Sequence, residues 1–162
     1  MNVGLEMKGL QLWRSVALLT AVWAFSAPAG ADGRLMPAQV PSVYKQECAA
    51  CHTAYPPGLL PAASWRRIMG GLDRHYGSDA SLEPAQVQQV SAWLLAHAGT
   101  YKRVREEPPQ DRITRSAWFV RKHREIAPAV WQRASIQSAA QCSACHTQAE
   151  QGQFDEHQVR IP

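Results

Sequence analysis

Apolar side chains recur at the spacing of an α-helix in several stretches of the sequence. In the clearest stretch, between residues 62 and 76, apolar and aromatic side chains are three or four positions apart, and one histidine joins the series: Trp65, Ile68, Met69, Leu72, His75 and Tyr76. This spacing places them on one face of an amphipathic helix, and a glycine such as Gly77 commonly follows a helix C-terminus. We therefore predict a helix over residues 62–76.

Further helices are predicted from the same signals. They cover residues 41–50, with Pro41 at the first helical position; 81–98, with Ser81 as N-cap; 113–126, ending before Pro128; and a short stretch over 128–135. Ser138 is predicted to cap a last helix that carries residues 142–146, and residues 148–162 are predicted to form a polar tail. No stretch shows the alternation of a β-strand. The predicted fold class is therefore all-α.

The N-terminal stretch has the pattern of a signal peptide. Lys8 and Arg14 precede an apolar run over residues 15–27, which is shorter than the roughly 20 residues that a membrane-spanning helix needs. Small residues at positions 29–31 fit a cleavage site before Asp32. We predict a signal peptide over 1–31, export to the periplasm, and a mature form that does not span the membrane. An uncleaved N-terminal anchor is the alternative.

Length and charge limit what the remaining 32–162 segment can be. The whole chain has 162 residues, which suits one small domain. A polar connector over residues 100–110 separates one half, at about 39–100, from another at about 108–155. Without residues 1–31, which hold Glu6, Lys8 and Arg14, the net charge falls from +4 to +3. The segment has no long basic block and no zinc-finger or recognition-helix pattern, so nucleic acid is not an expected partner.

The four cysteines define the chemistry. They lie in two C-x-x-C-H boxes, which we call the first box (residues 48–52, CAACH) and the second box (residues 142–146, CSACH). This motif is the signature of c-type haem attachment. Two thiols three positions apart can form thioethers with the two vinyl groups of one porphyrin, and the adjacent histidine can then bind the iron. The sequence therefore predicts two covalent haem c groups, attached through Cys48, Cys51, Cys142 and Cys145.

Three other interpretations of the boxes fit less well. A disulfide framework does not need a histidine after each cysteine pair. A thioredoxin-like motif is single and lies in a βαβ pattern, which is absent here. A zinc ribbon uses two C-x-x-C pairs, but the two boxes are much farther apart than the usual spacing of about 15–20 residues.

Each predicted iron needs a second axial ligand besides His52 or His146. His75 lies on the apolar stripe of its predicted helix, three residues after Leu72. His123 follows Phe119 by four positions, again on the apolar side. A neutral imidazole on such a face is well placed to bind a haem iron. We predict that His75 and His123 are the distal ligands.

Other side chains compete for these roles. His97 also lies on an apolar helix face, but it is close to a predicted C-terminus, where histidines interact with the last carbonyl groups. His157 lies in the polar tail. Met69 is explained by core packing, although as a ligand it would raise the potential of the first haem. Periodicity alone does not decide between His75 and His97.

The chain also resembles a known family, the bacterial dihaem cytochromes c that serve as electron donors to a small oxygen-binding monohaem cytochrome. The resemblance covers nearly all of 32–162, and its most specific segments are HTAYPPGLLPAASWRRIM after the first box, WFVRKHREI, and SAAQCSACHTQAEQGQFDEHQVRIP at the end. It implies an all-helical cytochrome c-type domain wrapped around two neighbouring haems. It further implies two histidine ligands to each iron, with His75 and His123 in the distal positions.

These features predict a periplasmic carrier of single electrons rather than an enzyme. Two imidazoles per iron leave no open position for a substrate. The expected partners are redox proteins, with a small oxygen-binding monohaem cytochrome and a membrane cytochrome as candidates. Two alternatives stay open at this point: an electron-entry subunit of a periplasmic reductase complex, and a haem enzyme with one open iron site.

Overall fold

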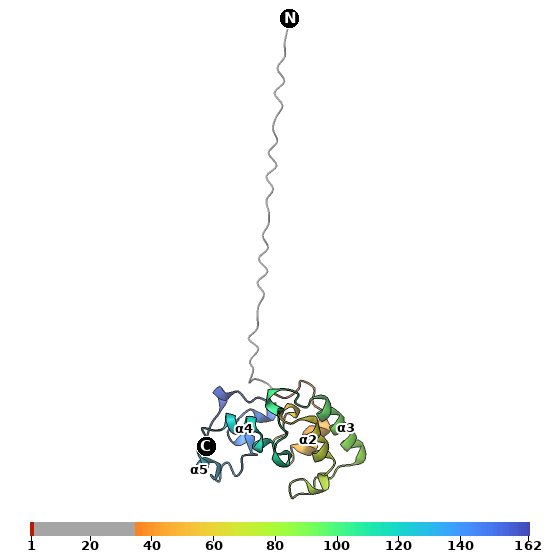
Figure 1. The fold of residues 1–162 in the computed structure, drawn as a ribbon, viewed down its shortest axis with the longest axis vertical. Helices are drawn as coiled ribbons and strands as arrows, with labels where there is room; N and C mark the ends of the chain where they lie inside the picture. Colours follow the sequence, from red (N-terminus) through yellow and green to blue (C-terminus); the bar gives the residue numbers. More distant parts are fainter. Residues whose placement is uncertain (2–34) are drawn as a thin grey trace.

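The structure is a computed structural model that describes Met1 and residues 35–162. The predicted signal peptide, apart from Met1, lies outside the described residues. The described part is built from α-helices and short 3₁₀ turns, with isolated β-bridges in place of strands (Figure 1). Its α-helices are α1 (Ser42–Cys48), α2 (Ala62–Met69), α3 (Pro84–Ala96), α4 (Ala117–Lys122) and α5 (Pro128–Trp131). The predicted all-α class is confirmed.

Short 3₁₀ turns connect these helices. They are η1 (Pro57–Leu59), η2 (Leu72–Arg74), η3 (Lys102–Val104), η4 (Pro109–Asp111), η5 (Ile113–Arg115), η6 (Cys142–Ala144), η7 (Ala149–Gln151) and η8 (Glu156–Gln158). In Figure 1, α2 and α3 lie on one side of the molecule and α4 and α5 on the other. Among the described residues, no helix has the length and apolar character needed to cross a membrane.

The helix predicted over residues 62–76 is too long. Helix α2 ends at Met69, with Gly70 as its C-cap, and the chain turns through η2 before reaching His75. Two consecutive glycines weaken a helix because their backbones lose more conformational entropy on folding than any other residue. His75 therefore lies in a turn after the helix, and not on a helical stripe.

Helix α3 begins later than predicted. Its N-cap is Glu83 and Pro84 is its first residue, so the predicted cap Ser81 lies outside it. The side-chain oxygen of Gln86 accepts a hydrogen bond from the backbone N–H of Glu83 at 3.2 Å. A proline at the first helical position and a glutamine that bonds back to the cap residue are both strong start signals.

The second half of the chain is less helical than predicted. Residues 113–126 form η5 and α4, with Ser116 as the N-cap of α4 and His123 as its C-cap. The stretch over 128–135 contains a helix as predicted, α5. The helix predicted to carry the second box is wrong: η6 is a single 3₁₀ turn, and Ser138 accepts a bond from the N–H of Ala140 instead of capping a helix.

The apolar core lies between α1, α2 and α3. It contains these buried side chains: Val43, Tyr44, Leu59, Leu60, Trp65, Met69, Val90, Leu94 and Ile113. The indole N–H of Trp65 donates to the carbonyl oxygen of Pro57 at 2.7 Å, so the largest of these side chains has its polar atom satisfied. This core supports the first box, because α1 ends at Cys48.

Candidate functional site

The first box places its histidine opposite His75. The ring centres of His52 and His75 are 6.2 Å apart, and their planes are 25° from parallel. His52 follows α1 directly after the cysteines, and His75 reaches the same place from the turn after α2. Both rings belong to partly buried residues. The structure therefore brings the histidine of the first box together with one of the two predicted distal ligands.

The second box has the same relationship with His123. The ring centres of His123 and His146 are 6.1 Å apart, and their planes are 79° from parallel. His123 comes from the end of α4, where its ring packs on Phe119 with centres 4.0 Å apart. His146 directly follows the η6 turn that carries the second box.

Both separations fit two imidazoles on opposite sides of one metal ion. A bond between an imidazole nitrogen and a metal is about 2 Å long, so two such ligands in line have ring centres about 6 Å apart. Direct stacking of the rings would bring them closer, as with His123 on Phe119. The gap between the paired rings thus has the size that an iron atom in a haem plane requires.

Hydrogen bonds orient one ring in each pair. Nδ1 of His52 lies 2.7 Å from the carbonyl oxygen of Thr53, and Nδ1 of His123 lies 2.9 Å from that of Phe119. Each contact fixes the tautomer in which Nδ1 carries the proton, which leaves the Nε2 lone pair available to a metal. The buried Nδ1 of His146 makes no such bond.

Burial keeps the other two rings neutral. It is the main cause of a lowered pKa for both His75 and His146, and the facing histidine lowers each pKa further. Arg112 adds a smaller effect on the pKa of His75. Neutral imidazole is the form that binds a metal, so the environment favours the ligand form.

No disulfide joins the four cysteines of the two boxes, so all four can form thioethers. Cys51 is exposed, and the other three are partly buried. Burial raises the pKa of Cys48 to about 11 and that of Cys142 to about 11. The thiols of Cys48 and Cys142 are therefore in the protonated form near neutral pH.

An apolar cavity surrounds the second pair. It is lined by Cys142, Cys145, His123 and His146, and its aromatic walls are Trp118, Phe119, Trp131 and Phe154. Such a cavity suits the apolar faces of a porphyrin. Tyr55, from the loop after the first box, also lines it.

The C-terminal segment closes this cavity, which the sequence analysis missed by treating residues 148–162 as a polar tail. Val159 and Ile161 line it beside Phe154, whose ring centre is 5.4 Å from that of His146. The N–H of Arg160 donates to the carbonyl oxygen of Cys145 at 2.9 Å. The apolar residues at 154, 159 and 161 were the available signal.

The competing side chains lie elsewhere. His97 is exposed at the C-cap of α3, and its Nδ1 is 2.9 Å from the carbonyl oxygen of Trp93. This contact matches the predicted role at a helix end. Met69 is buried in the core, and His157 is exposed in η8.

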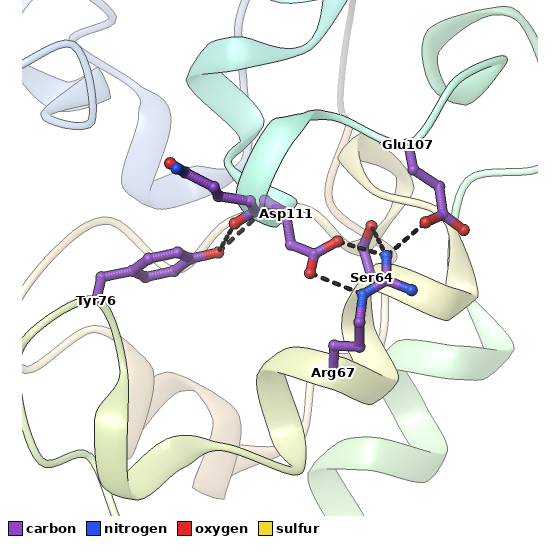
Figure 2. A network of polar contacts seen from close by, with 6 residues as sticks. Ser64, Arg67, Tyr76, Glu107 and Asp111 are labelled. Carbon is purple, nitrogen blue, oxygen red and sulfur yellow. Dashed lines mark hydrogen bonds and ion pairs between the residues drawn. The ribbon is translucent and has the colours of Figure 1, made fainter.

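A polar network holds the turn that carries His75 (Figure 2). The Tyr76 hydroxyl lies 3.2 Å from the carbonyl oxygen of Gln110 and 3.0 Å from that of Asp111. The Asp111 carboxylate accepts two hydrogen bonds from Arg67 of α2, at 2.9 and 2.7 Å. Glu107 pairs with the same guanidinium at 2.6 Å. The residues before α4 are thereby tied to both α2 and the His75 turn.

Comparisons with known proteins define the class. The model of the family described as dihaem cytochrome c matches residues 44–154. The chain therefore belongs to the dihaem cytochrome c family, whose members carry two covalently bound haem c groups and transfer electrons. The two boxes supply the cysteines for attachment, as predicted.

Solved structures agree with this assignment. A diheme cytochrome c from Rhodobacter sphaeroides is 40% identical; the match covers 71% of this chain and 97% of that one, with a TM-score of 0.64. A diheme cytochrome type c from Shewanella baltica is also 40% identical; the match covers 76% of this chain and 95% of that one, with a TM-score of 0.66. Comparison with curated protein sequences gives no significant match.

Proposed function

We propose that this protein carries single electrons between redox partners in the periplasm through two haems, each with two histidine ligands. His52 and His75 bind the first iron, and His146 and His123 bind the second. The observation that carries this assignment is the separation of the ring centres in the two pairs, 6.2 and 6.1 Å. Each separation leaves room for one metal ion between two imidazoles.

This coordination supports electron transfer without substrate chemistry. An iron bound by two imidazoles in addition to the porphyrin has no free position for oxygen or peroxide. Two imidazoles also favour a lower reduction potential than a histidine and methionine pair. The polypeptide supplies one orienting hydrogen bond to each pair and apolar walls around the second pair.

The partners are other redox proteins that dock transiently. The resemblance noted from the sequence points to a small oxygen-binding monohaem cytochrome as acceptor, and a membrane cytochrome is a further candidate partner. Four exposed basic side chains support docking of an acidic surface, namely Lys102, Arg105, Arg121 and Arg124. Charges of this kind steer encounter more than they add affinity.

Carbon monoxide tests the closed coordination. The reduced protein is mixed with carbon monoxide at neutral pH, and its Soret absorption is followed. We expect no spectral change, because both irons keep their histidines. A rapid, large shift of either haem would show an open iron and favour the enzyme alternative. We also expect the mature chain, isolated from the periplasm, to be heavier than its polypeptide by the mass of two haems.

A further inference from the structure

Tyr55 contacts the first site through its ring. The ring is stacked on that of His52, with centres 4.7 Å apart and planes 17° from parallel. The backbone at this point is held by the buried Tyr44, whose hydroxyl donates to the carbonyl oxygen of Tyr55 at 2.6 Å. Tyr55 is thus fixed against one histidine of the first pair.

The same side chain reaches the second site. Its hydroxyl donates to the carbonyl oxygen of Ala140 at 2.8 Å, across 85 positions of sequence. Ala140 lies two residues before Cys142. Tyr55 also lines the cavity that contains Cys142, Cys145 and His146. One side chain therefore contacts the first histidine pair and forms part of the wall of the second haem cavity.

The hydroxyl has a structural reason to stay bonded. A partly buried hydroxyl that loses its acceptor costs free energy, because nothing replaces the bond. The contact with Ala140 is accordingly a fixed tie between the two halves.

We propose that Tyr55 is a positioning residue that sets the orientation of the two haems relative to each other. It does so by holding His52 at a defined place beside the segment that leads into the second box. Electron transfer between the haems depends on their separation and orientation, so this tie also sets how readily an electron passes between them. The inference rests on the proposed binding of one haem at each histidine pair.

Circular dichroism in the Soret band measures the orientation of the two haems relative to each other. Two haems held close together at a fixed angle couple their transitions and give a pair of bands of opposite sign. The amplitude of the pair depends on mutual orientation and distance, and not on the ligands of either iron alone.

Tyr55→Phe removes only the bond to Ala140, whereas Tyr55→Leu also removes the stacked ring. Trp65→Phe is the control, because it removes a buried hydrogen bond in the first half without reaching the second site.

We expect the band pair to weaken in Tyr55→Phe and to weaken several-fold in Tyr55→Leu, with both haems still low spin. Trp65→Phe should lower the melting temperature and leave the band pair unchanged. If Tyr55→Leu does not acquire both haems, the inference is tested by Tyr55→Phe alone. An unchanged band pair in a Tyr55 variant that keeps two low-spin haems would overturn the inference. A change in the first haem alone would also overturn it. Failure of the wild-type protein to show two low-spin haems would instead refute the proposed function.

Discussion

The imidazole planes of His123 and His146 are nearly perpendicular, at 79°. The planes of the first pair are 25° apart. Parallel imidazoles raise the energy of the same iron d orbital and split it from its partner, whereas perpendicular imidazoles raise both orbitals similarly. The oxidised protein should therefore give two different low-spin signals in low-temperature electron paramagnetic resonance, with the larger maximal g value at the second haem.

Substitution assigns the two signals. His123→Met should remove the signal with the larger g value and leave the other in place. Two superimposed signals with the same g values would contradict the difference in ring angle. If His123→Met instead loses the signal with the smaller maximal g value, the two signals have been assigned to the wrong histidine pairs.

His75 and His97 should respond differently to substitution. His75→Met replaces an imidazole with a thioether at the first iron, which raises the reduction potential of that haem. His97→Gln changes two contacts with Trp93, one with its carbonyl oxygen and one with its ring, and neither reaches a histidine pair, so both potentials should stay at their wild-type values. Redox titration followed by visible absorption checks both outcomes. A high-spin haem in His97→Gln would show that His97 is a ligand.

The ion pair between Arg67 and Asp111 should make a pH-dependent contribution to stability. Hydrogen bonds from Arg67 are the main cause of the lowered pKa of Asp111. A carboxyl whose pKa is lower in the folded state stabilises the fold above its ordinary pKa of about 4, and loses that contribution as the pH falls through the folded pKa.

Thermal unfolding of Asp111→Asn tests this dependence. At neutral pH the variant should melt a few degrees below the wild type, because the Arg67 side chain is half exposed and ion pairs with an exposed partner contribute modestly. The difference should shrink as the pH is lowered below 4. A difference that stays constant down to pH 2 would mean that the charge of Asp111 is not the cause.

Gly152 should be hard to replace. Its φ is +73°, and a Cβ there would lie 2.2 Å from the Cβ of Met36. The left-handed backbone alone costs a non-glycine residue about 1–2 kcal/mol. Its carbonyl oxygen accepts from the N–H of Leu35 at 3.0 Å, so a displaced Gly152 would loosen the segment that closes the second cavity.

Denaturant unfolding of Gly152→Ala should show a loss larger than the backbone cost, since Met36 must also move. Gly58→Ala is the matched control, because the nearest atom to its new Cβ would be the His97 carbonyl oxygen at an ordinary 3.9 Å. That variant should unfold within about 0.5 kcal/mol of the wild type. Equal stabilities for the two variants would show that Gly152 is under no constraint.

Local sequence patterns predicted the haem chemistry better than they predicted the helix ends. Each box consists of five consecutive residues, so both boxes can be recognised without knowledge of the tertiary structure. The end of α2 was misplaced because apolar residues keep their helical spacing past Gly70 and Gly71, although the α-helical backbone ends at Met69. His75 still comes to face His52, from a turn and not from a helix.

Contacts between distant segments could not be predicted in the same way. Periodicity placed His123 on an apolar helix face, but it placed His97 on such a face as well. Only the fold shows that His123 lies beside His146. The closing role of residues 154–161 depends on pairing with the second box, through contacts such as Arg160 with Cys145. The hydrogen bond from Tyr55 to Ala140 spans 85 positions, and no local pattern marks it.

Near-infrared magnetic circular dichroism of the oxidised protein tests the histidine assignment most directly. The charge-transfer band from porphyrin to low-spin iron shifts with the identity of the two axial ligands, and high-spin iron gives a different spectrum. Two low-spin haems, both with the band of paired histidines, are the predicted result. A band typical of histidine and methionine, or a high-spin component at either haem, would contradict it.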